Sequence, residues 1–443
     1  MHRLVLLTLL LMLLCLNTVK SNAACQIRII SLSLCNTQGD EVTASELHPH
    51  YTLRLIWEVQ GQPSAGYHVI LTIANQRAVY NFSARPGNFS AVLSAYLPIV
   101  GKIPYSAQID PGHVTDNTLD SQSARSGVFV PKMPSTAVLY YNPKSYVGKE
   151  TLNCSYTSQP NSKSQALMVM AEPSTGTFQT VTTSVAPTDA QKITSAGSNQ
   201  TGWLISCSPT NPKATLQSWH TDQLFHVECS SAAVNSKLAN LVSWSDFSNL
   251  PENKRVWLKP EFNIESDSPV VRAFVQHILP ADFKTTMTPY QAARTIFLAI
   301  VKKTVYVRDG QDPDTVDTLK THTANCEGFS TVFVACMRSL GIPARALCGV
   351  LADTGERHCI AEFYLPGAGW IPADSAYAKG YDPTGTYAFF FGDDPDLNHF
   401  CVISRCTGFQ IPNHSSEIMP AGSFFTQNVL SSTCQETCVL TPQ

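Results

Sequence analysis

Three residues of the types that form catalytic triads follow one another in the last third of this 443-residue chain: Cys326, His358 and Asp374. A cysteine thiolate attacks a carbonyl carbon, an imidazole takes and returns the proton, and a carboxylate orients the imidazole. If the three side chains meet in space, the chain can transfer acyl groups from amides or esters. We therefore predict Cys326 as the nucleophile, His358 as the base and Asp374 as the orienting acid.

The candidate nucleophile stands where a helix is predicted to begin. Apolar residues follow it at helical spacing, namely Phe329, Val332, Phe333, Cys336, Met337 and Leu340. Gly341 suits a left-handed C-terminal cap, and Pro343 prevents the helix from continuing. The unpaired N–H groups and the positive dipole end at a helix start favour a thiolate over a thiol. The same N–H groups are suited to stabilising an oxyanion.

The candidate base and acid stand on predicted strands. Residues 344–351, 358–365 and 370–374 read as three consecutive strands separated by turn residues. The hairpin formed by the second and third strands returns the aspartate to the side of the histidine. A bulge at Gly369 would set both side chains on one face of the sheet.

These segments resemble the transglutaminase-like superfamily of cysteine enzymes. The resemblance covers residues 257–406 and rests on segments 326–329, 338–345, 358–365 and 369–374, on Gly349, and on the pairs 391–392 and 398–399. The family has a papain-like α+β core with a Cys-His-Asp triad, and it includes protein-crosslinking transferases, proteases and amidases. The resemblance implies thiol chemistry on protein or peptide amides without a cofactor, and it assigns the triad to Cys326, His358 and Asp374.

Two positions depart from the family pattern. Asn325 stands where the family often has glycine, and Ile360 stands where it often has tryptophan. The upstream oxyanion donor is not identified, although Tyr306 and His322 lie in the right stretch. His322 and His399 are rival bases, but neither has the strand and the aspartate partner of the predicted base.

Cysteine parity supports the choice of nucleophile. The chain has 14 cysteines, and removal of Cys15 with a signal peptide leaves 13, an odd number for an oxidising compartment. Pairing twelve leaves one free thiol, which we predict to be Cys326. The alternative is that Cys326 is bonded and another cysteine is spare. Cys348 and Cys359 lie nearly equidistant from a turn, which predicts a cross-strand disulfide.

The N-terminus and the composition indicate a secreted protein. Residues 1–24 combine a basic start, a short apolar run and small residues at a cleavage site, which is typical of a signal peptide. A lipid anchor at Cys25 is the weaker alternative. The apolar run is too short for stable transmembrane insertion. A net charge of −3 argues against nucleic acid as a partner. Metal-ligand spacings and phosphate loops are absent from the sequence, so we predict no metal and no cofactor.

The predicted fold class is α+β, with two β-sandwich domains before a papain-like core. Alternating strands and regular turns indicate the sandwiches, and helical periodicity first appears after Ser268-Pro269 and Thr288-Pro289. The predicted parts are a signal peptide at 1–24, an immunoglobulin-like sandwich at 25–131, a second β-rich domain at 137–250, the catalytic domain at 257–406 and a C-terminal tail at 407–443.

Two classes of function follow. The first is a secreted thiol enzyme that acts on protein or peptide amides through an acyl-enzyme, with transfer to an amine or to water. The second is an extracellular adhesion or binding protein whose transglutaminase-like domain is catalytically degenerate. The complete Cys-His-Asp set favours the enzyme. The sequence does not indicate an oligomeric state.

Overall fold

The computed structural model shows an α+β fold in two compact units, one with the described residues up to Phe129 and the other with those from Thr136 onward. The structure describes residues 26–35, 50–60, 66–73, 76–83, 85–96, 103–110, 124–129, 136–158, 165–188, 190–195, 200–207, 216–261, 263–308, 314–386, 388, 390–405, 409–410, 417–418, 424–427 and 429–443. The predicted signal peptide, Cys25 and the segment 131–135 lie outside these residues.

The first unit is a β-sandwich. Its smaller sheet has the strand order β1 (Gln26–Cys35), β2 (His50–Gln60), β5 (Gly87–Tyr96). Its larger sheet has the order β4 (Gln76–Phe82), β3 (Tyr67–Ile73), β6 (Ile103–Asp110), β7 (Ala124–Phe129). Alternate residues of both sheets form one buried core, in which the Trp57 indole donates a hydrogen bond of 3.1 Å to the Tyr67 hydroxyl.

The second unit begins with another pair of sheets that share buried residues. One sheet has the order β10 (Gln179–Val185), β13 (Leu216–Val234), β8 (Val138–Ser158), β23 (Val429–Pro442). The other has the order β11 (Ala190–Thr194), β12 (Thr201–Cys207), β9 (Gln165–Ala171), β22 (Phe424–Gln427). Segment 407–443, expected as a tail, thus supplies an edge strand to each sheet.

The second unit continues into the core that holds the candidate triad. Its sheet has the order β18 (Gly369–Ala373), β17 (Arg357–Leu365), β16 (Ala344–Leu351), β19 (Phe400–Ser404). The longer helices are α4 (Pro269–Ile278), α6 (Pro289–Lys303), α7 (Thr315–Thr321), α8 (Cys326–Leu340) and α9 (Ser375–Tyr381). The shorter elements are α2 (Ser236–Ala239), η1 (Trp244–Asn249), α3 (Glu252–Arg255), η2 (Val256–Leu258), α5 (Phe283–Thr286), β14 (Val305–Tyr306), β15 (Thr323–Ala324), η3 (Leu397–His399), β20 (Phe409–Gln410) and β21 (Glu417–Ile418).

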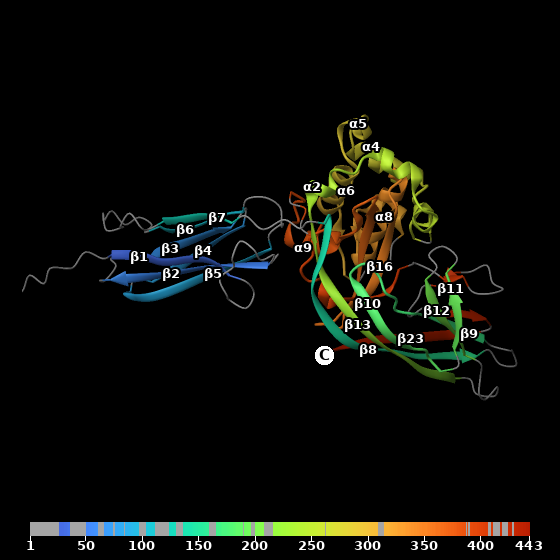
Figure 1. Cartoon of the computed structure of the whole chain (residues 1–443). Coiled ribbons are helices and arrows are strands. Elements are labelled where there is room, and N and C mark those ends of the chain that lie inside the picture. Colours follow the sequence, from blue (N-terminus) through green and yellow to red (C-terminus); the bar gives the residue numbers. More distant parts are fainter. Residues whose placement is uncertain are drawn as a thin grey trace, which may run out of the picture. The chain divides into compact units, whose positions relative to one another are not determined.

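Helix α8 packs against β16 and β17 and is buried on nearly all sides (Figure 1). Phe333 of the helix meets Phe363 of β17 edge to face, with ring centroids 5.8 Å apart. Gly341 ends the helix with a φ of 85°, as its predicted role requires. The predicted starts of α4 and α6 are also confirmed, because the Ser268 and Thr288 side chains accept N–H groups of the first turn.

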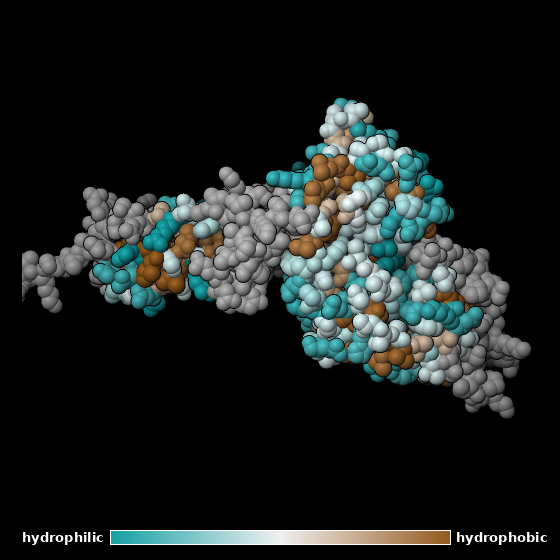
Figure 2. Space-filling model, viewed as in Figure 1, coloured by the Kyte–Doolittle hydropathy of each residue, from teal (hydrophilic) through white to brown (hydrophobic). Residues whose placement is uncertain are grey.

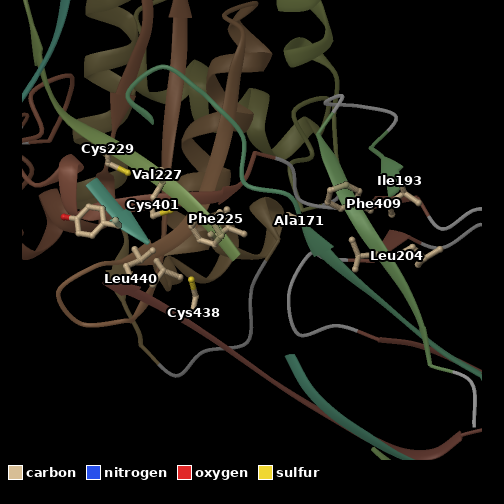
Figure 3. Close-up of a cluster of buried hydrophobic side chains, with 14 of the residues drawn as sticks. Ala171, Ile193, Leu204, Phe225, Val227, Cys229, Cys401, Phe409, Cys438 and Leu440 are labelled. Atoms are coloured by element: carbon tan, nitrogen blue, oxygen red, sulfur yellow. The ribbon is translucent and has the colours of Figure 1, made fainter. Parts of the chain in front are cut away.

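The second pair of sheets and the sheet β18-β17-β16-β19 share one hydrophobic core. Figure 3 shows Cys229 and Val227 of β13 beside Cys401 of β19, with Cys438 and Leu440 of β23 nearby. The buried Gln179 side chain of β10 fastens this junction. Its amide donates to the Val402 carbonyl at 2.8 Å, and its oxygen accepts the Val402 N–H at 2.6 Å. A side chain of β10 therefore satisfies backbone groups of β19, the edge strand of the sheet that holds the candidate triad.

The surface carries apolar residues in scattered groups. Figure 2 shows brown apolar groups separated by polar residues on the viewed face. Within the part of the chain that the structure describes, no helix is long and apolar enough to cross a membrane.

Candidate active site

Cys326 is the first residue of α8, as the sequence predicts. Asn325 is the N-cap residue, and its side-chain oxygen accepts the Gly328 N–H at 3.1 Å. The asparagine that replaces the family's usual glycine therefore has a local role, since it satisfies one of the helix's unpaired donors. The thiol is half-buried.

His358 and Asp374 meet directly. The Nε2 atom of His358 lies 2.5 Å from Oδ2 of Asp374, and both side chains are buried. The predicted bulge at Gly369 is not needed. Strand β17 pairs with β18 without a register shift, from Leu365 opposite Gly369 to Ala361 opposite Ala373. Asp374 instead leaves the strand and becomes the N-cap of α9, where its Oδ1 accepts the Tyr377 N–H at 2.9 Å.

Cys326 completes the arrangement through an electrostatic interaction with His358. Asp374 occupies Nε2, so Nδ1 is the nitrogen that is left for the thiol. Ser330, one turn into α8, fixes the helix to the strand that carries the histidine. Its hydroxyl lies 2.9 Å from the carbonyl oxygens of both Cys326 and Cys359, so its single proton is shared between these two acceptors. The structure thus brings all three predicted site residues together.

The surroundings of His358 favour the imidazolium. Burial lowers the pKa of His358, but the charge of Asp374 and the hydrogen bonds to Asp374 and Cys326 outweigh it and raise the pKa to about 10. A charged imidazole beside a thiol stabilises the thiolate. This arrangement can hold the proton of Cys326 on His358 and return it to a leaving group.

Two aromatic rings enclose the His358 ring. Tyr377 stacks on it with a centroid distance of 4.5 Å and an interplanar angle of 28°. Phe400 meets it edge to face at 5.7 Å. The sequence reasoning missed Tyr377. The available signal was its position three residues after an aspartate that begins a helix, where its N–H is available to that carboxylate.

Asp394 is a second residue that the sequence reasoning missed. It is buried, and burial together with the charges of Asp374 and Asp396 raises its pKa well above the ordinary range. Among the described residues, no group of three or more His, Cys, Asp or Glu side chains is arranged to hold a metal ion.

The rival histidines have other surroundings. His322 is an exposed residue that ends α7 in the left-handed conformation. The His399 ring contacts Lys144, and burial together with that charge lowers its pKa. Tyr306 is half-exposed, and burial followed by the charge of Cys326 raises its pKa. Of the two oxyanion candidates, Tyr306 is therefore the one with an electrostatic interaction with the nucleophile.

The cysteine pairing agrees with the sequence in one respect and corrects it in another. Cys348 and Cys359 form the predicted disulfide, which joins β16 to the strand that carries His358. The expectation of a single free thiol is wrong, because Cys326 is one of several free cysteines in the described chain. The others, all buried, are Cys35, Cys229, Cys336, Cys401 and Cys438. Buried thiols pack as small apolar residues without forming disulfides, so an odd number of cysteines does not mean that a single thiol is free.

Comparison with known proteins shows which proteins this chain is similar to. Residues 279–375 match the sequence profile of the transglutaminase-like superfamily. An uncharacterised protein of Haemophilus influenzae is 30% identical over 149 residues, which are 27% of this chain and 39% of that protein. The chain therefore spans less than half the length of this curated relative.

Two solved structures are similar at low identity. A candidate cysteine protease from Cytophaga hutchinsonii has 14% identity and a TM-score of 0.44, over 69% of this chain and 100% of its own. The periplasmic domain of TgpA from Pseudomonas aeruginosa has 16% identity and a TM-score of 0.24, over 52% of this chain and 75% of its own. The matched segment of the present chain is a transglutaminase-like core in an α+β fold.

Proposed function

From this transglutaminase-like core, we propose that the chain is a secreted thiol enzyme that acts on protein or peptide amides through an acyl-enzyme on Cys326. The observation that carries the proposal is the series of interactions from Cys326 to His358, which is electrostatic, and from His358 to Asp374, which is a direct contact of 2.5 Å. Many proteins use these groups singly for other purposes: a thiol at a helix start, a buried imidazole or a buried carboxylate. In series they form a nucleophile, a base and an orienting acid.

The first half-reaction forms a thioester. The Cys326 thiolate adds to the amide carbon, and the carbonyl oxygen becomes an oxyanion. N–H groups at the start of α8 that have no partner within the helix are suited to stabilising this charge. The C–N bond then breaks, and the leaving amine takes its proton from the His358 imidazolium. Asp374 keeps the imidazole oriented while its charge changes.

The second half-reaction releases the acyl group. Neutral His358 takes a proton from the acceptor, which is an amine or water, and the acceptor attacks the thioester carbon. The carbon–sulfur bond breaks and the thiolate returns beside the imidazolium. An amine gives a new amide, whereas water gives a carboxylic acid. How well the pocket excludes water decides between the two products.

Secretion is part of the proposal. The signal-peptide pattern of residues 1–24 supports it. The Cys348–Cys359 disulfide supports it as well, because such bonds persist in oxidising compartments.

Thiol labelling of the native protein tests the proposal. Iodoacetamide should modify Cys326 within minutes near neutral pH, and peptide mapping should find Cys336 unmodified. Cys336 is the matched control, because it is a free thiol on the same helix but is buried, and burial raises its pKa far above the ordinary range. Labelling of Cys326 no faster than that of a free cysteine peptide would count against the enzyme and in favour of a degenerate domain.

A substrate panel then identifies the acceptor. Glutamine-containing peptides are incubated with a primary amine, and the products are read by mass spectrometry. A product with the added amine means transfer, and a deamidated or cleaved product means hydrolysis. The Cys326→Ser variant should form neither product.

A further inference from the structure

We propose that Tyr377 is a positioning residue of the thiol site, whose ring fixes the plane of the His358 imidazole and shields its bond to Asp374 from water. This inference rests on the proposed function of Cys326, His358 and Asp374. It assigns a role to a residue that touches both partners of the nucleophile.

The first observation is that Tyr377 contacts both residues at once. Its ring lies against the His358 ring at 4.5 Å, and its backbone N–H donates to Asp374 Oδ1 at 2.9 Å. The carboxylate therefore has one oxygen on the imidazole and the other on the first turn of α9. The turn that holds the acid also places the ring that covers the base.

The second observation is that Tyr377 is itself held by a strained residue. Phe390 meets the Tyr377 ring edge to face at 5.6 Å, and its carbonyl accepts the Asp374 N–H at 2.9 Å. The φ of Phe390 is 58°, a conformation that is costly for a bulky side chain. Such strain persists only where the surroundings enforce it, and it is concentrated at functional sites. Here the strained backbone places the Phe390 carbonyl at the Asp374 N–H and the Phe390 ring against Tyr377.

The third observation concerns burial. His358 and Asp374 are 6% and 2% exposed, whereas Tyr377 is partly exposed. The tyrosine ring, which stacks on the His358 ring, thus covers part of the buried pair and is itself partly open to solvent. A hydrogen bond between charged groups is stronger when water is kept away from it. The Phe400 ring, which meets the imidazole edge to face, also limits its rotation. A flat ring at position 377 therefore keeps His358 aligned with Asp374 while its Nδ1 exchanges a proton with the thiol.

Two variants separate the ring from the hydroxyl. Tyr377→Phe keeps the flat aromatic face. Tyr377→Leu keeps the apolar volume but loses the flat face. Neither change removes the backbone N–H that caps Asp374. The Leu variant should alkylate Cys326 about two- to tenfold more slowly at pH 6, the range expected from an aromatic pair. Its labelling should also require a higher pH, while the Phe variant should follow the wild type within about twofold.

Tyr381→Leu is the matched control. Tyr381 lies one turn later in α9 and contacts Phe390 at 5.1 Å, whereas the ring contacts of His358 in the described structure are with Tyr377 and Phe400. The control should keep the wild-type pH profile. NMR titration of His358 adds a second readout, and its pKa should fall in the Leu variant alone.

The outcomes are distinguishable. If the wild type itself labels slowly, the proposed function fails. If the wild type labels fast and the Leu variant keeps its pH profile, Tyr377 is only a packing residue and this inference is overturned, whatever the melting temperature. Equal losses in the Phe and Leu variants would also overturn it, because the hydroxyl and not the ring face would then matter.

Discussion

Replacement of Asp374 by asparagine removes one charge from the site and leaves its shape nearly unchanged. Asparagine is as good an N-cap as aspartate, so the Tyr377 N–H keeps an acceptor and α9 keeps its start. The His358 imidazolium, however, loses its counter-charge in a buried position. Burial then acts without opposition and lowers the pKa of His358.

The magnitude follows from the pKa of His358 in the wild type. A rise from 6.5 to about 10 corresponds to about 5 kcal/mol in favour of the imidazolium. The charge of Asp374 is the largest of the favourable contributions. Each pKa unit that His358 loses makes transfer of the thiol proton to the imidazole about tenfold less favourable. At pH 6 the Cys326 alkylation rate should therefore fall by at least about tenfold in Asp374→Asn.

Stability provides a second measure with a definite sign. The folded-state pKa of His358 lies above its unfolded value, so its contribution is fully present below about pH 6.5 and is lost as the pH rises through about 10. The melting temperature of Asp374→Asn should be furthest below that of the wild type near pH 5 to 6, and the two should converge near pH 10.

Asp396→Asn is the control for charge loss as such. Asp396 raises the pKa of Asp394, whereas the largest effects on the pKa of His358 come from burial, Asp374 and Cys326. The control should label like the wild type. If Asp374→Asn also labels like the wild type at pH 6, the acid does not hold the imidazolium, and the triad assignment would be wrong.

Three further predictions concern the support of the site. Gln179→Leu leaves both backbone groups of Val402 without their side-chain partner, so chemical denaturation should show a loss of about 1–3 kcal/mol; an unchanged midpoint would contradict this role. Burial, followed by the charge and hydrogen bond of Glu436, raises the pKa of Glu150 in the folded state. Above the unfolded pKa of about 4.3, the folded state therefore binds more protons than the unfolded state. The free energy of unfolding consequently falls as the pH rises. Glu150→Gln stays neutral, so its melting temperature should gain on the wild type between pH 5 and pH 8, and a constant difference would refute this. A Cβ on Gly349 would lie 1.9 Å from the Cys401 carbonyl oxygen, so Gly349→Ala should separate β16 from β19 and lower the melting temperature, whereas Gly380→Ala, with open space around its Cβ, should not.

Features with a local cause could be predicted from the sequence. The start and end of α8 follow from apolar spacing and from Gly341, and the structure confirms both. The Cys348–Cys359 disulfide follows from the distance of each cysteine to the turn between them. Each of these depends on residues within one helix or one hairpin, where geometry is set by the chain itself.

The route from Asp374 to His358 could not be predicted, because it depends on where a strand ends. Continuing the strand to residue 374 made a bulge necessary. In the structure the strand ends at Ala373 and Asp374 caps a helix. The residues after it lack a strong helical pattern, and the Phe390 carbonyl that fixes the Asp374 N–H comes from a distant segment. Tertiary contacts, not propensity, decide this turn.

The C-terminal strands were missed for a related reason. β23 pairs with β8, almost 300 residues earlier in the chain, and β22 pairs with β9. The strands carry many Ser and Thr residues, so their alternation is weak in the sequence. Pairing between such distant segments is determined by packing and not by a local signal.

The second sandwich gives a reason to prefer the enzyme over the adhesion protein. Gln179 satisfies the edge of the catalytic sheet, and Arg357, the residue before His358, forms an ion pair with Glu436 of β23. These contacts engage the sandwich with the strands around the histidine. A domain that served only as a scaffold would gain little from these polar contacts. Burying charges is costly, and apolar residues would stabilise its core equally well. A buried imidazolium–carboxylate pair beside a partly accessible thiol is therefore better explained by chemistry than by folding.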